Sequence, residues 1–168
     1  MPFAHTLDVM KIDDLPPDLK FPLLASTVEG RDFSFMVKKQ ALGAHIAHRW
    51  GWNEEFQREV HDQRFREKPF YLIELKSIPI GTLSLSEQPN HLRFGEFYLI
   101  DAFRGQGIGS QILTHCLGIA EKMNLAVRLE YLRWNPVGSL YRRNGFVEVD
   151  QSSTHFFMER PERLEINE

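Results

Sequence analysis

The chain has 168 residues, 42% of them hydrophobic, which is enough for one domain with a single substantial core. Its net charge of −3 argues against general nucleic-acid binding, because nucleic-acid-binding domains usually carry a basic patch or stripe. The single cysteine, Cys116, excludes an internal disulfide and suits a reducing compartment.

The N-terminus has no apolar signal core, and no apolar run reaches membrane-spanning length. We therefore expect a cytoplasmic protein without a membrane partner or a nucleic-acid partner. The sequence leaves the oligomeric state open, with a homodimer as one option.

The first third of the chain is expected to pass from irregular backbone into two helices. Prolines interrupt regular structure up to Pro22, residues 24–28 favour a brief strand, and Gly30 favours a turn. Residues 33–66 then have a mostly helical pattern, broken near residues 50–53, with Asn53 as the N-cap of the second helix.

Histidines in these helices raise the question of a metal site. His45 and His48 share one helical face, and His61 follows in the second helix. Because no third ligand stands at a fixed spacing, ordinary surface or packing histidines are the favoured interpretation, and no metal is predicted.

Three strands are predicted next, at residues 70–75, 80–86 and 91–100, with a hairpin loop at residues 77–79 between the first two. They form a meander. The last of them leads into a glycine-rich turn, Arg104-Gly105-Gln106-Gly107-Ile108-Gly109, and then into a helix.

This turn is typical of an anion-binding loop, because its glycines let the backbone approach a ligand at a helix N-terminus. A P-loop is excluded, since no Gly-Lys-Ser/Thr ending follows. A dinucleotide fingerprint also fails, because its third glycine would fall on Ser110 and too little chain remains for repeated βαβ units.

The remaining elements are a strand at residues 125–134, a short helix at 137–143, and a final hairpin made of residues 146–149 and 154–159. In the strand, Val127, Leu129 and Tyr131 share one face, with Glu130 on the other. The tail after Arg160 is polar.

Two motifs in this half resemble the GCN5-related N-acetyltransferase (GNAT) family. The glycine-rich turn is similar to the family's Arg/Gln-x-x-Gly-x-Gly/Ala signature. Residues 135–146, N-P-V-G-S-L-Y-R-R-N-G-F, are similar to its N-P-x-x-x-x-Y-x-x-x-G-F pattern, in the family's order. The resemblance covers residues 70–160 firmly and the first helices loosely.

The resemblance implies a single N-acetyltransferase domain over residues 1–168, with residues 161–168 as its polar tail. Its fold class is α/β (α+β): a mixed, mostly antiparallel central sheet with a V-shaped splay, flanked by helices on both faces. Acetyl-CoA would be the co-substrate, with no metal. The residues implied to bind it are Leu99, Ile100, Arg104, Gly105, Gln106, Gly107, Ile108, Gly109, Ser110, Asn135 and Tyr141.

The implied reaction is direct attack of a primary amine on the thioester. Tyr141 matches the tyrosine that commonly protonates the departing thiolate. Glu130 and Glu96 are both candidates for the general base, and the family often uses a water relay or no dedicated base.

The acceptor is expected to be a small-molecule or peptide amine. Trp52 and Glu55 are candidate substrate-binding residues, because an aromatic ring beside a carboxylate attracts an ammonium group. We expect this pocket between residues 50–56 and the hairpin loop at 150–154. The alternatives are a plain helix junction at this place and, for the whole chain, a non-catalytic acyl-CoA-binding or regulatory module.

Overall fold

The computed structural model describes residues 18–163. Most of the irregular backbone expected before Pro22 lies outside this range, as does the end of the polar tail.

A seven-stranded sheet organises the molecule, in the order β1-β2-β3-β4-β5-β7-β6. All neighbouring strands are antiparallel except β4 and β5, which are parallel. The strands are β1 (Leu19–Lys20), β2 (Phe70–Leu75), β3 (Ile78–Glu87), β4 (His91–Leu99), β5 (Ala126–Leu132), β6 (Val147–Gln151) and β7 (His155–Arg160). The predicted mixed, mostly antiparallel sheet is therefore confirmed.

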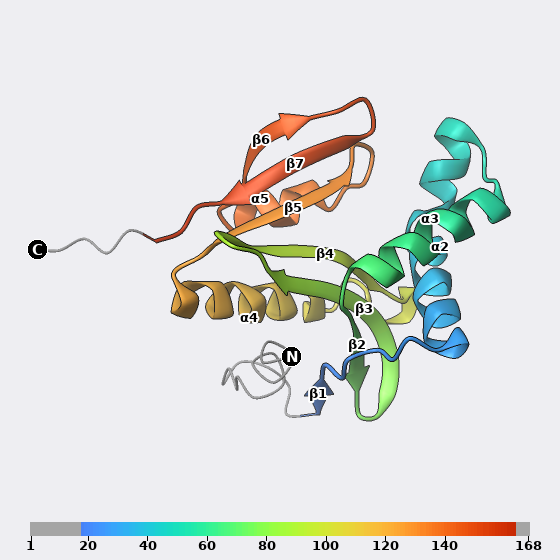
Figure 1. The fold of residues 1–168 in the computed structure, drawn as a ribbon, viewed down its shortest axis with the longest axis horizontal. Coiled ribbons are helices and arrows are strands. Elements are labelled where there is room, and N and C mark those ends of the chain that lie inside the picture. The colour runs from blue at the N-terminus through green and yellow to red at the C-terminus, as the bar shows by residue number, and fades with distance from the viewer. Residues whose placement is uncertain (1–17, 164–168) are drawn as a thin grey trace, which may run out of the picture.

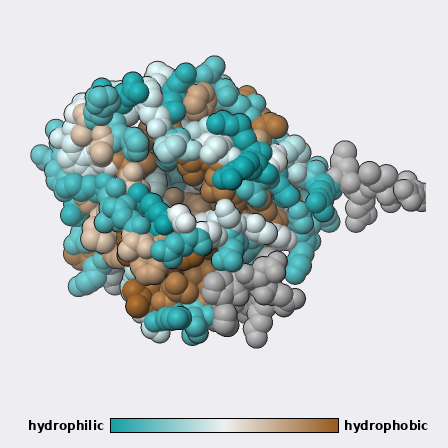
Figure 2. All heavy atoms as spheres, turned by 180° about the vertical axis from the view of Figure 1, so that it is seen from behind, coloured by the Kyte–Doolittle hydropathy of each residue, from teal (hydrophilic) through white to brown (hydrophobic). Residues whose placement is uncertain are grey.

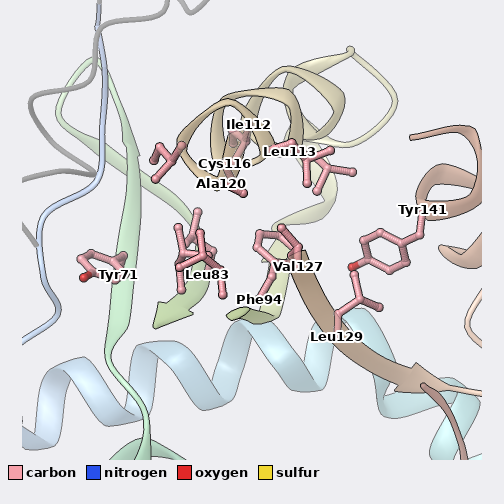
Figure 3. Packing of buried hydrophobic residues seen from close by; sticks show 14 of the residues in the cluster. Tyr71, Leu83, Phe94, Ile112, Leu113, Cys116, Ala120, Val127, Leu129 and Tyr141 are labelled. Atoms are coloured by element: carbon pink, nitrogen blue, oxygen red, sulfur yellow. The ribbon is translucent and has the colours of Figure 1, made fainter. Parts of the chain in front are cut away.

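Helices cover both faces of this sheet. Figure 3 shows α4 on one side of the central strands and α2 on the other. The helices are α2 (Val28–Trp50), α3 (Glu54–Glu67), α4 (Ile108–Met123) and α5 (Gly138–Arg143), with a 3₁₀ turn, η1 (Asp101–Phe103), before the glycine-rich loop. No helix among the described residues is both long and apolar enough to cross a membrane.

The main core lies between α4 and the sheet. Ile112, Leu113, Cys116 and Ala120 fall at helical spacing on the face of α4 that packs against the central strands (Figure 3). Burial raises the pKa of the Cys116 thiol to about 12, so this cysteine is a buried, unreactive core residue.

The start of α2 differs from the prediction. The Thr27 side chain accepts a hydrogen bond from the Gly30 N–H, so the helix begins at Val28 and contains Gly30. The strand expected at 24–28 does not form, and the nearest sheet contact is a single bridge between Leu23 and Tyr71. The Thr27 cap was the signal that the prediction missed.

The junction of α2 and α3 follows the prediction. α2 ends at Trp50, and the Asn53 side chain accepts a hydrogen bond from the Phe56 N–H as the N-cap of α3. The β2–β3 turn is tighter than predicted: Lys76 and Ser77 form it with positive φ, and Ile78 already belongs to β3.

Candidate functional site

The two central parallel strands separate part-way along their length. β4 and β5 are paired only from His91↔Ala126 to Arg93↔Arg128, although both strands continue beyond these residues. A β-bulge lies on β4 just past the paired region, where Glu96 has a φ of 47° and the β3–β4 register shifts. Because a bulge bends its strand, β4 turns away from β5. The two strands diverge toward α2 and α3 (Figure 1), and the V-shaped splay is confirmed.

A cavity of about 430 Å³ lies beside the glycine-rich loop. Gly105 and Gly107 have φ of 72° and 82°, and a Cβ at either would meet no atom within 4 Å, so the loop is open to a ligand. α4 begins at Ile108. Because the first N–H groups of a helix lack partners inside it, this helix end can receive an anion.

The predicted cofactor residues divide into two groups by position. Those that line this cavity are Leu99, Arg104, Gly105, Gly107, Gly109, Ser110 and Asn135. Ile100, Gln106, Ile108 and Tyr141 do not line it.

Arg104 is folded back onto its own loop. Its Nε donates to the Leu99 carbonyl oxygen at 2.8 Å, and its Nη1 lies 2.8 Å from Asp101 Oδ1. The N–H of Ile100, another of the implied cofactor residues, donates to the Ile80 carbonyl oxygen at 2.8 Å, so β3 already takes this amide. In this conformation the loop backbone, rather than Arg104, offers the free donors.

A second cavity, of about 490 Å³, lies between the α2–α3 pair, the splayed strands and the β6–β7 hairpin. It meets the first cavity along a common wall made of Leu42, Phe97, Tyr98, Asn135 and Val137. The surface in Figure 2 is hollowed near its centre, with hydrophobic side chains exposed there. The two cavities therefore adjoin each other at this part of β4.

Tyr141 extends from α5 to the wall of this larger cavity. Its ring packs against Phe94, Tyr131 and Phe146, and Figure 3 shows it pointing toward β5. Burial, together with the nearby Tyr131, raises the pKa of the Tyr141 phenol. The hydroxyl is therefore protonated at neutral pH and can donate a proton or a hydrogen bond.

Residues 66–148, which contain the splayed strands, the glycine-rich loop and Tyr141, match the family model described as "Acetyltransferase (GNAT) domain". This region of the chain is a GNAT domain. No curated protein matches the chain.

Solved structures agree with this family fold. The PaiA N-acetyltransferase of Thermoplasma acidophilum, in complex with coenzyme A, is 21% identical with a TM-score of 0.65, over 84% of this chain and 99% of that one. A Pyrococcus horikoshii protein is 19% identical with a TM-score of 0.68, over 87% and 99%. An acetyltransferase of Streptococcus agalactiae is 8% identical with a TM-score of 0.61, over 87% and 99%. At these identities the likeness shows the fold alone.

Glu96, one of the two base candidates in this GNAT domain, is buried among cations. Its Oε1 lies 3.4 Å from Arg64 Nη1 and 3.6 Å from Lys68 Nζ. Burial is the largest single influence and disfavours the carboxylate, but Lys38, Arg64 and Lys68 together outweigh it and lower the pKa of Glu96. A carboxylate held in its charged form is a weak base, so this environment favours an electrostatic role.

Glu130, the other candidate, lies on β5 at the edge of the larger cavity. Its Oε1 is 3.7 Å from Arg93 Nη2, and about a third of its side chain is exposed. Glu130 is therefore more accessible than Glu96 to water and to an incoming amine.

Trp52 and Glu55 lie beside the larger cavity without lining it. The Trp52 ring contacts Phe35, and its Nε1 donates to Glu54 Oε2 at 2.6 Å. Glu55 is exposed to solvent. The cavity does lie between the α2–α3 junction and the β6–β7 hairpin, as predicted, but Trp50 and Phe56 form its aromatic wall.

Trp50 also connects the two halves of the site. Its ring meets Trp134, which follows β5, edge-on at 4.7 Å, and the Arg49 guanidinium lies 4.7 Å from the Trp134 ring centroid. This contact spans the open side of the splay, so the end of α2 is held against the second half of the sheet.

Several residues in the larger cavity were not predicted, notably Lys38, Arg64, Lys68, Tyr98 and His155. Burial lowers the pKa of His155, and its Nδ1 lies 2.8 Å from the Thr154 hydroxyl, so it is a neutral imidazole at the cavity wall. No sequence pattern marked these residues, because they come from separate elements that meet only in the folded chain.

No group of three or more metal-ligating side chains forms within residues 18–163. His61 is instead a buried packing residue, with its ring among those of Phe35, Phe65 and Phe70.

Proposed function

We propose that the protein is an acetyl-CoA-dependent N-acetyltransferase that moves an acetyl group to a primary amine. The observation that carries this proposal is the pair of adjoining cavities, one at the glycine-rich loop and one beside Tyr141, with a common wall along the splayed end of β4. A cofactor in the first cavity and an acceptor in the second would meet at this wall.

The cofactor's pyrophosphate would lie at the N-terminus of α4. Support comes from the open positive-φ glycines Gly105 and Gly107 and from the free N–H groups that follow them. Arg143, at the wall of the same cavity, adds a cation that could face a phosphate. The pantetheine arm would then follow the edge of β4, past Leu99 and toward Phe97.

The acceptor's neutral amine would attack the thioester carbonyl carbon, so that a C–N bond forms and the C–S bond breaks. The bulge at Glu96 frees backbone groups of β4 that can bind the developing oxyanion. Tyr141 would give its proton to the departing thiolate, and Glu130, directly or through water, would accept the proton lost by the amine. Glu96 stays the alternative base, disfavoured by its surrounding cations.

Incubation of the protein with acetyl-CoA and a panel of primary amines, followed by mass spectrometry, tests this function. An acetylated amine together with free coenzyme A is the expected result. Tight coenzyme A binding without any acetylated product would instead identify a non-catalytic acyl-CoA-binding module.

We also propose a cytoplasmic location, because the only cysteine is free and buried, as suits a reducing compartment. Cell fractionation tests the location. Light scattering of the purified protein measures its molar mass and so tests whether it forms a homodimer.

A further inference from the structure

Three basic side chains converge on one carboxylate at the floor of the larger cavity. Arg64 from α3 and Lys68 just after it lie 3.4 Å and 3.6 Å from Glu96 Oε1. Lys38, from α2, is close enough that its charge lowers the pKa of Glu96. All four residues line the cavity.

The charges in this cavity do not balance. Glu96 supplies one negative charge against three positive charges, while the other acidic residue of the lining, Glu130, faces Arg93 at 3.7 Å. Within the described residues the cavity therefore has an excess of positive charge near Glu96. The phosphates of coenzyme A would not neutralise it, because they belong at the glycine-rich loop in the other cavity.

The excess charge is held where water cannot screen it well. Lys38 is only 6% exposed, and burial lowers its pKa to about 8 in spite of the nearby Glu96. Placing a cation in a buried position is costly unless it is paired. A purely structural network would be expected to supply more than one carboxylate, so these cations suit an anionic ligand.

Apolar side chains line the cavity beside these charged groups, on the same faces of α2 and α3. They are Leu42, Ile46 and Trp50 from α2 and Phe56 and Val60 from α3. A ligand that fits both surfaces has an anionic group and a hydrophobic part.

We propose that the acceptor is an amine that also carries a carboxylate, namely a small amino acid with an apolar side chain. Its carboxylate binds Arg64 and Lys38, its side chain packs on the wall from Leu42 to Val60, and its amine is directed to the meeting point of the two cavities. This inference rests on the proposed acetyl transfer and names its substrate class. It narrows the expected small-molecule or peptide amine to one with a carboxylate, because the excess positive charge would repel an acceptor that carries only positive charge.

Matched pairs of acceptors test the proposal. Phenylalanine is compared with phenethylamine, and leucine with isoamylamine, because each pair differs only in the carboxylate. We expect kcat/KM for acetyl transfer to be at least about tenfold higher for each amino acid, since a charge-assisted hydrogen bond is lost with the carboxylate. Equal or better transfer to the decarboxylated amines would overturn the inference while leaving the proposed function intact.

Variants of the basic residues test whether the preference for a carboxylate arises at Arg64 and Lys38. Arg64→Met should raise KM for the amino acid about tenfold or more and leave KM for its decarboxylated partner nearly unchanged. Lys38→Met should do the same and serves as the second variant if Arg64→Met does not fold. Arg66→Met is the matched control, because Arg66 lies on the same helix, is exposed, and is absent from the cavity wall. A KM rise that is equal for both members of a pair would indicate a general packing role and contradict the subsite.

Calorimetry with saturating coenzyme A separates this inference from the proposed function. Binding of phenylalanine, without binding of phenethylamine, that is lost in Arg64→Met would establish the carboxylate subsite even if no acetyl group were transferred. Absence of amino-acid binding to the wild-type protein would refute it.

Discussion

Tyr141 illustrates how the position of one side chain decides its chemistry. Its ring is buried among Phe94, Tyr131 and Phe146, and this burial raises the pKa of its phenol. The phenol is therefore protonated at working pH, so it has a proton to donate to a departing thiolate. The phenolate form that a base would need is disfavoured by the same burial.

Tyr141→Phe should slow turnover by roughly a hundredfold, the scale of losing a general acid, and should leave coenzyme A affinity almost unchanged. Pre-steady-state kinetics under conditions where chemistry limits the rate, together with calorimetry, provide the measurement. Tyr71→Phe is the control, because Tyr71 is a buried core tyrosine on β2 that also loses only a hydroxyl. If Tyr141→Phe and the wild-type protein turned over at equal rates, Tyr141 would have a packing role and would not be the general acid.

At the scale of single elements, the proposed binding of coenzyme A by the glycine-rich loop depends on the backbone conformation of that loop. Gly107→Val should weaken coenzyme A binding by at least tenfold, because a branched residue disfavours the left-handed conformation by about 1–3 kcal/mol and would crowd the open face of the loop. Titration calorimetry on the folded variant measures this. Gly51→Val is the control, because Gly51 also has positive φ, at 76°, and open space at its Cβ, but lies outside the loop. Unchanged affinity in folded Gly107→Val would move the site elsewhere.

The β3–β4 pair depends on Gly81, which pairs with Leu99 on β4. A Cβ at Gly81 would clash with the Tyr98 carbonyl oxygen, a backbone atom that can move only if β4 moves. Gly81→Ala should therefore destabilise the protein by about 1–3 kcal/mol and lower Tm by roughly 4–10 °C. Gly95→Ala, whose Cβ would meet no atom within 4 Å, should leave Tm within a degree or two in the same scan. Similar losses in both variants would show that the close approach to Tyr98 is not the cause.

At the scale of the whole molecule, the α2–α3 pair is joined by a buried histidine that makes stability depend on pH. The Ser34 hydroxyl donates to the Arg31 carbonyl oxygen, so His61 Nε2–H must donate to Ser34 Oγ, 2.6 Å away. His61 Nδ1 is buried and has no hydrogen-bond partner among residues 18–163. Burial, aided by the charge of Lys38, lowers the pKa of His61 to about 4.

Between pH 6.5 and about 4 the unfolded chain therefore binds a proton at His61 that the folded chain does not. The free energy of unfolding should fall as the pH decreases through this window. Urea unfolding at pH 7, 6, 5 and 4.5 measures the effect. His61→Gln keeps a donor toward Ser34 but cannot titrate, so its profile should be flatter. Parallel profiles for the two proteins would assign the acid sensitivity to other groups, such as the ion pairs of Glu96.

The sequence alone determined the elements whose signals are local. Asn53 caps α3 through a hydrogen bond three residues away, and the buried residues of α4 recur at helical spacing. The glycine-rich loop and the motif around Tyr141 are also contiguous, so order and spacing were sufficient to indicate the GNAT fold and the cofactor site. The sequence analysis did not place the start of α2 correctly, although Thr27 is a residue type that commonly caps helices. The reason is that the one-residue bridge at Leu23 and the helix cap lie only a few residues apart.

Only the tertiary structure decided the acceptor cavity. Lys38, Arg64 and Glu96 come from three elements, and their mutual distances depend on how α2 and α3 pack over the bulge of β4. The same packing puts Trp50, rather than Trp52, in the cavity wall. Charge excess and burial are properties of groups brought together from distant parts of the chain. No local pattern encodes them, and so the sequence could indicate only an amine acceptor, while the proposed carboxylate of that acceptor rests on the fold.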